Sequence, residues 1–120
     1  AAFARGSRAA LGVTAMGPKT TTLVGLLDSA AAVLRSCGEE HWASWLEKDA
    51  ALMQAGDFKG VEHFLRAFGG MGSINDVVLH PINGHRVAEL DVDAINERFQ
   101  TLLSQASELA RQVRNEAVIQ

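Results

Sequence analysis

The C-terminal part of the sequence carries an apolar repeat that a long α-helix would place on one side. From Ile95 onward, apolar side chains recur at alternating intervals of four and three residues, which is heptad spacing. The repeat comprises Ile95, Phe99, Leu102, Ala106, Leu109 and Val113, widened by Leu103, Ala110 and Ala117. A helix from Val92 to about Val118, with Asp91 as its N-cap, would be about 40 Å long. We therefore predict an all-α or mainly α protein built around this last helix.

The preceding sequence shows the same three-and-four spacing in three shorter segments. Gly38 and Gly56 follow the first two segments, where a glycine suits the end of a helix. Asp57 is a suitable cap for the third, in which Gly60 is a mild weakness. The predicted helices cover residues 20–37, 39–55 and 57–68, and with the last they make a four-helix bundle-like domain.

Length and composition favour one ordinary globular domain. The chain has 120 residues, of which 48% are hydrophobic and 21% charged. Its longest apolar run, residues 30–34, is too short to cross a bilayer, so we expect no membrane association. Cys37 is the only cysteine, which excludes an internal disulfide and a zinc site built from several cysteines. With no recognisable signal sequence, we expect a cytoplasmic protein.

The N-terminal segment lacks this periodicity. Residues 1–18 are rich in Ala, Gly and Arg, and we interpret them as an arm that precedes a single helical domain over residues 19–120. We expect Phe3, Leu11 and Val13 to pack on that domain or on a neighbouring chain.

Charge is concentrated in the middle of the chain. Residues 39–97 hold eleven acidic and four basic residues, a balance of −7, against +3 before them and +1 after them. An acidic surface repels nucleic acid and would favour a basic partner. A solvated acidic face with no partner is the plainer explanation.

A glycine-rich segment separates the third and fourth helices. Three glycines, Gly69, Gly70 and Gly72, are followed by Ser73-Ile74-Asn75-Asp76, which resembles a capping box with Asp in place of Glu. We expect positive φ angles at Gly70 and Gly72. A short helix ending before Pro81 is slightly preferred. The alternative is a strand over residues 77–79 in a hairpin with an Asn83-Gly84 turn.

Either structure makes residues 69–90 a long, ordered connection across one end of the bundle, and such connections often carry function. The candidate binding residues lie in it or beside it. They are Trp42, Gly70, Gly72, Ser73, Asn75, Asp76, His80 and His85. We expect Trp42 at the rim of the core beside His41, and we expect Asp49 or Glu62 to accept a hydrogen bond from a buried tryptophan N–H.

The spacing of the candidate residues in the sequence does not favour a catalytic site or a metal site. The glycines follow a helix and no lysine comes after them, which argues against a phosphate-binding loop. Asp76, His80 and His85 would be the ligands of a metal site, but their spacing does not favour one. No catalytic residue, metal or cofactor is predicted, and an enzyme is the less favoured class.

Two segments resemble a known family. They run from Gly38 to Leu46 (GEEHWASWL) and from Phe68 to Leu79 (FGGMGSINDVVL), and they are similar to a family of small uncharacterised bacterial proteins. The Gly-Gly-Met-Gly-Ser-x-Asn-Asp run is the sharpest motif, and the similarity covers about residues 20–115. The resemblance implies no established activity. By analogy, it implies carriage on a mobile gene cassette or a role as an immunity protein beside a toxin.

Two classes of function remain open. The first is a non-enzymatic binding protein that uses residues 69–90, in its most concrete form an immunity-like protein that blocks a basic toxin. The second is a small-molecule binder or enzyme with a pocket between the second helix, the third helix and the glycine segment. The far end of the C-terminal helix is expected to meet a partner chain, as in a homodimer, or the N-terminal arm, and a long bundle helix with a frayed end is an equal alternative.

Overall fold

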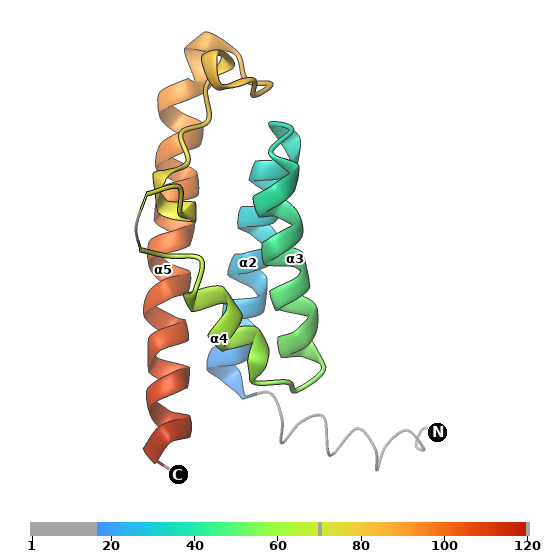
Figure 1. The fold of residues 1–120 in the computed structure, drawn as a ribbon, viewed down its shortest axis with the longest axis vertical. Coiled ribbons are helices and arrows are strands. Elements are labelled where there is room, and N and C mark those ends of the chain that lie inside the picture. Colours follow the sequence, from blue (N-terminus) through green and yellow to red (C-terminus); the bar gives the residue numbers. More distant parts are fainter. Residues whose placement is uncertain (1–16, 70, 120) are drawn as a thin grey trace, which may run out of the picture.

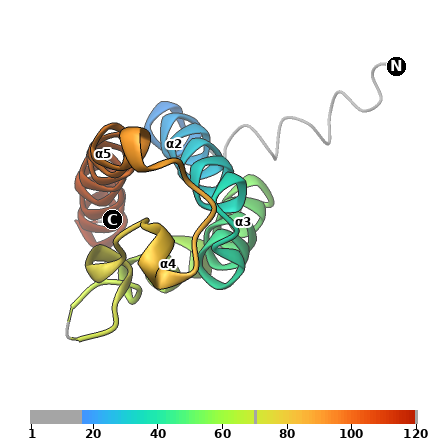
Figure 2. The same cartoon turned by 90° about the horizontal axis from the view of Figure 1, so that it is seen from above.

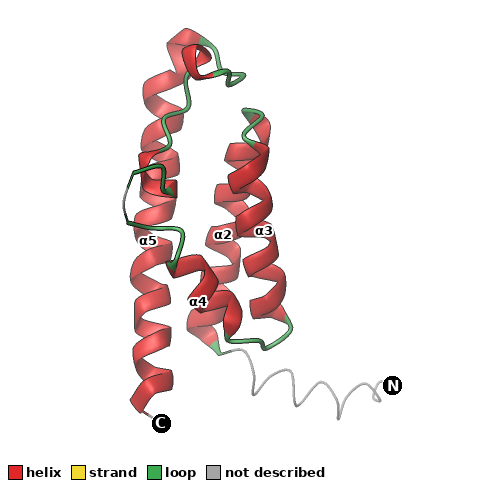
Figure 3. Ribbon diagram, in the orientation of Figure 1, coloured by secondary structure: helices red, strands yellow, loops and turns green. Residues whose placement is uncertain are grey.

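The computed structural model describes residues 17–69 and 71–119, and its regular structure in this part of the chain is helical (Figures 1 and 3). Four α-helices are joined by turns and by a connection that contains three short 3₁₀ helices. In chain order the elements are α2 (Pro18–Ser36), α3 (Glu40–Gln54), α4 (Lys59–Leu65), η1 (Ile74–Asp76), η2 (Pro81–Asn83), η3 (Glu89–Asp91) and α5 (Val92–Ile119). The predicted all-α class and four helices are confirmed.

The long C-terminal helix has the predicted length and position, with 28 residues in α5. Its apolar stripe faces the chain's own core, where Phe99, Leu103 and Ala106 are buried. Leu109 and Val113 are partly buried and pack against the same core. The heptad spacing is therefore used within the chain along the full height of the bundle (Figure 1).

The first helix starts earlier than predicted. Pro18 is the first residue of α2, because its fixed φ angle suits the N1 position and its missing N–H is not needed there. Pro18 thus belongs to the helix and not to the predicted arm, whose residues 1–16 lie outside the described part of the chain. Gly38, with φ +79°, follows the helix end as predicted.

The third predicted helix is shorter than expected. α4 ends at Leu65 instead of Phe68, because Ala67 and Phe68 continue in 3₁₀-type hydrogen bonds to Phe64 and Leu65. The N-cap of α4 is Phe58 and not Asp57 as predicted, although the Asp57 carboxylate accepts a hydrogen bond from Lys59 N at 2.9 Å.

Gly60 is a packing requirement and not a weakness of the helix. A Cβ atom at this position would lie 2.8 Å from the backbone oxygen of Asp49 and 3.0 Å from side-chain atoms of Leu52 and Met53. The close approach of α3 and α4 therefore depends on glycine at this crossing.

Seen along the bundle, the helices enclose a common core and the connection crosses one end (Figure 2). α2 packs against α3 and α5, and α4 packs against α3 and α5. Because α4 is short, the connection that follows it runs alongside α5 before crossing to the α2–α3 end (Figure 1). The polar candidate residues are placed by this connection.

The alternative β-hairpin is wrong. Residues 77–80 are not part of a strand in the described structure, and the backbone of Leu79 is instead held by a side chain of α5. Leu79 N donates to Asn96 Oδ1 and Asn96 Nδ2 donates to Leu79 O, both at 2.8 Å. Gly84, at φ +85°, ends η2 and not a hairpin turn. The preferred short helix is confirmed as the single turn η1.

Within residues 17–69 and 71–119, no helix is both long and apolar enough to span a membrane.

Candidate functional site

The turn before η1, here called the glycine turn, has a backbone conformation that suits glycine and is hydrogen-bonded by Asp76. Gly69 and Gly72 have φ angles of +95° and +80°, whereas Gly70 lies outside the described residues. The expected positive φ is thus confirmed at Gly72. The Asp76 carboxylate accepts from Gly72 N at 3.0 Å, and Asp76 N donates to the backbone oxygen of Ser73.

The predicted capping box is wrong in its details. The Ser73 side chain makes no cap hydrogen bond to η1, and its Oγ instead lies 2.6 Å from Asn75 Oδ1, to which it donates. Ser73 is buried, while Asn75 and Asp76 are exposed. This turn therefore presents a carboxylate and an amide on a backbone whose shape depends on glycine.

A second group of predicted residues meets at the end of the bundle around Glu39. His85 Nδ1 accepts from the backbone N–H of His80 at 3.2 Å, so His85 Nε2 carries the proton and donates to Glu39 Oε1 at 2.9 Å. The other Glu39 oxygen accepts from Trp42 N at 3.4 Å, at the start of α3. His80 Nδ1 in turn accepts from Ile82 N at 3.0 Å.

Arg86 fastens the same part of the connection to the α2–α3 turn. Its backbone N–H donates to the carbonyl oxygen of Cys37 at 2.8 Å. Its guanidinium lies over Gly38, where an added Cβ would be only 3.0 Å from Nη1. Together with the hydrogen bonds between Asn96 and Leu79, these contacts hold the connection against α5 and against the α2–α3 turn.

The connection displays most of the exposed large apolar side chains of the described structure. Ile82 and Leu90 are 84% and 96% exposed, Met71 is 98% exposed and Val78 is 53% exposed. The other such residue, Phe58, lies before α4 and is only 37% exposed. Residues 71–93 also contain four acidic side chains and one basic one. Exposed apolar and acidic side chains therefore both occur along one segment, which hydrogen bonds at Leu79, His85 and Arg86 tie to the rest of the bundle.

An aromatic row runs along α3 and continues onto α4. The rings of His41 and Trp42 are 4.7 Å apart, those of Trp42 and Trp45 are 5.0 Å apart, and Trp45 stacks on His63 at 4.1 Å. Both tryptophans are half-buried and pack against the core. The predicted position of Trp42 at the core rim beside His41 is confirmed.

Asp49 lies at the inner end of this row and is fully buried. Its Oδ1 is 2.5 Å from Nδ1 of His63. Burial raises the pKa of Asp49 to about 6, while the hydrogen bond and charge of His63 oppose this shift. Asp49 Oδ2 and Trp45 Nε1 are buried and have no hydrogen-bond partner among the described residues. The expected bond from the Trp45 N–H to Asp49 is therefore not formed, and His63 contacts the carboxylate instead.

Sequence reasoning missed the pairing of Asp49 with His63. The signal for Asp49 was its place among the apolar residues of the α3 core face, between Leu46 and Met53. The signal for His63 was absent, because its distance from Asp49 depends on how closely α4 packs on α3.

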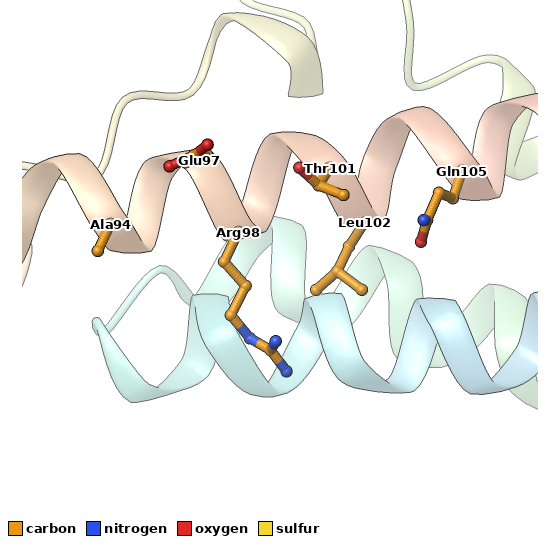
Figure 4. A pocket seen from close by; sticks show the side chains of 6 residues that line it. All are labelled: Ala94, Glu97, Arg98, Thr101, Leu102 and Gln105. Carbon is orange, nitrogen blue, oxygen red and sulfur yellow. The ribbon is translucent and has the colours of Figure 1, made fainter.

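The hollow in Figure 4 lies along α5, away from the predicted residues. It has a volume of about 410 Å³ and is lined by Ala94, Glu97, Arg98, Thr101, Leu102 and Gln105. Arg98 and Leu102 point from α5 toward α2 (Figure 4). Among the described residues that line it, Glu97 and Arg98 are charged, and they are of opposite sign.

The predicted site residues thus form two groups. Trp42, His80 and His85 meet around Glu39, whereas Gly72, Ser73, Asn75 and Asp76 gather at the turn around η1. In the described part of the chain, no three His, Cys, Asp or Glu side chains are placed to hold a metal ion.

The comparisons with known proteins find one family model that matches part of the chain. Residues 35–88 match the model of a family described as "Domain of unknown function (DUF6966)". The match covers α3, α4 and the connection as far as residue 88, and so includes both groups of candidate residues and the Asp49–His63 pair. No curated protein and no solved structure matches the chain.

Proposed function

We propose that this is a non-enzymatic binding protein whose contact surface is the connection over residues 71–91, and that its partner is another protein. The observation that carries the proposal is the exposure of Ile82 and Leu90, 84% and 96%, on a segment whose backbone is held in place. Single exposed apolar residues are ordinary, but several on one short ordered segment are typical of a contact surface.

The hydrogen bonds that hold the connection support this proposal. Asn96 clamps Leu79, Cys37 O accepts from Arg86 N, and Glu39 accepts from His85. A segment that is ordered before binding loses less conformational entropy in a complex, so more of its contact energy appears as affinity. The segment that displays apolar side chains to solvent is thus ordered before any partner binds.

Charge supports a partner with a basic surface. Glu89, Asp91 and Asp93 are close to Leu90 in the sequence, and Arg86 is the only basic residue in 71–93. Acidic groups at the rim of an apolar contact would attract a basic partner and exclude acidic ones. An immunity-like protein that blocks a basic toxin is the most concrete form of this proposal. The resemblance to small bacterial proteins carried on gene cassettes supports it only by analogy.

Photo-crosslinking tests the proposal. A photoreactive amino acid is placed at position 82, at position 90, or at the control position 54, and each protein is irradiated in an extract of cells that carry the gene. Gln54 is exposed at the opposite end of α3 from the connection. We expect a discrete crosslinked protein from positions 82 and 90 but not from position 54.

The crosslinked protein, identified by mass spectrometry and purified, then allows a quantitative test. We expect Ile82→Asp to weaken its binding by about tenfold or more, and Gln54→Asp to leave it unchanged. Equal affinities for both variants, or crosslinks from position 54 alone, would contradict the proposal. Loss of binding on changing Trp42, but not on changing Ile82 or Leu90, would instead favour the alternative pocket beside α3.

A further inference from the structure

The Asp49–His63 pair joins α3 to α4 with one end buried and the other near solvent. The Asp49 side chain is 0% exposed, whereas the His63 side chain is 27% exposed. Their atoms Oδ1 and Nδ1 are 2.5 Å apart. The proposed contact surface uses neither residue, and the pair is the only described one that joins a fully buried carboxylate to a titratable side chain.

The hydrogen bond defines where a proton would enter. With Asp49 ionised, His63 donates from Nδ1, which leaves Nε2 as the ring nitrogen that can accept a proton. Uptake of one proton by the pair, at this nitrogen or on the Asp49 carboxylate, removes the net negative charge of the pair. The hydrogen bond is kept, and the electrostatic cost of the buried negative charge falls.

The surrounding charges do little to offset that buried carboxylate. Lys48 on α3 and His63 on α4 are the groups whose charges act on Asp49. In the described residues, no charged group of α2, α5 or the connection is among them. His41 is a further titratable neighbour of the aromatic row, with its ring 6.1 Å from that of Trp45.

We propose that Asp49 and His63 form a proton-linked latch between α3 and α4, which takes up one proton on mild acidification and then holds α4 more tightly. α4 has only seven residues, too few to be stable without tertiary contacts. A further close contact with α3 is at Gly60, on the backbone of Asp49 itself. The charge state of the pair therefore acts where α4 is anchored, just before the glycine turn.

Trp45 provides a local reporter of the latch. Its ring stacks on His63 at 4.1 Å, so its fluorescence responds when His63 gains a charge. The sequence has two tryptophans, and a Trp42→Phe background leaves Trp45 as the only one. In that background we expect a reversible change in emission between about pH 5 and pH 7, around the pKa of about 6 of Asp49, the partner of His63.

Matched variants separate the latch from a nearby histidine. His63→Gln removes the proton-binding ring, and Asp49→Asn removes the carboxylate while keeping the side-chain shape. His41→Gln removes a histidine that also neighbours Trp45 but is exposed and has no acidic partner in the described structure. We expect His63→Gln to abolish the fluorescence change, Asp49→Asn to move it to lower pH, and His41→Gln to leave it in place.

Amide hydrogen exchange tests the tightening itself. After correction for intrinsic rates, the α4 amides of the unmodified protein should be protected about tenfold more at pH 5 than at pH 7.5, with no such difference in His63→Gln. Circular dichroism establishes that each variant is folded, and Asp49→Asn replaces His63→Gln if the latter is not. Equal α4 protection at both pH values, or a pH effect that only His41→Gln removes, would overturn the proposal.

Discussion

Asp49 shows how far the surroundings of one residue can change its chemistry. An aspartate on a short helix is ordinarily solvated and ionised, but this one lies on the buried face of α3 beside Ala50 and Met53. Its burial opposes ionisation, and His63 compensates only in part. A residue that costs stability at neutral pH is more simply explained by a function than by packing.

The raised pKa of Asp49 predicts a pH-dependent stability. Its value of about 6 in the folded protein exceeds the usual 3.8, so between these values the folded state binds more protons than the unfolded state. Stability should therefore fall as pH rises from about 4 to 6, by roughly 2 kcal/mol, and change little above that from this group. Urea unfolding at several pH values measures it.

Asp49→Asn is the matched variant, because it keeps the shape of the side chain but cannot ionise. Its stability should change less than that of the unmodified protein over the same pH range. Parallel pH profiles for the two proteins would show that Asp49 does not titrate as described.

Gly72 predicts a cost due to backbone conformation alone. Its φ angle is +80°, and a Cβ atom added there would meet nothing within 4 Å. Gly72→Ala should therefore destabilise by about 1 kcal/mol, or lower the melting temperature by about 3–5 °C, through strain without a clash. The adjacent Met71→Ala, at a side chain that is 98% exposed, should have little effect. Equal melting temperatures for the two variants would contradict the assigned turn.

At the scale of elements, periodicity predicts which segments are helical, and local contacts decide where they end. The three-and-four spacing identified all four helices, because each buries one apolar face. The spacing also predicts a third helix that continues to Phe68, because apolar residues recur that far, although α4 ends at Leu65. It also allowed a hairpin, because Val77 and Val78 favour strands, whereas Asn96 supplies the hydrogen bonds that a partner strand would have supplied.

Two glycines in helices should respond in opposite directions to alanine. Gly25 in α2 has no atom within 4 Å of an added Cβ, so Gly25→Ala should stabilise by about 0.5–1 kcal/mol. Gly60 in α4 meets backbone at 2.8 Å, so Gly60→Ala should destabilise by about 1–3 kcal/mol. Chemical denaturation measures both, and stabilisation by Gly60→Ala would contradict the close α3–α4 crossing.

The candidate site was predictable only in part, because its structure depends on contacts between residues that are distant in the sequence. Residue types and local turns indicated His80, His85 and the glycine turn, and these segments are ordered as expected. The partners that order them are distant in sequence: His85 meets Glu39 across 46 residues, and Leu79 meets Asn96 across 17. A single sequence contains no signal for such pairings, and the Asp49–His63 bond was missed for this reason.

At the scale of the whole molecule, the connection runs alongside α5 where a longer α4 would otherwise continue, and it then crosses the end of the bundle (Figures 1 and 2). It therefore belongs to the packed structure while displaying Ile82 and Leu90 to solvent. A homodimer through α5 stays a prediction. Because Leu109 and Val113 pack against the chain's own core, such a dimer would use the opposite face of the helix.

The exchange rates of two backbone amides test most directly whether the connection is a fixed surface. Leu79 N donates to Asn96 Oδ1 and Arg86 N donates to Cys37 O, whereas Ala88 N has no acceptor in the described structure. We predict that Leu79 and Arg86 exchange at least about tenfold more slowly than Ala88, and that Asn96→Ala removes the protection of Leu79. Exchange of Leu79 and Arg86 as fast as that of Ala88 would contradict a connection held in place for binding.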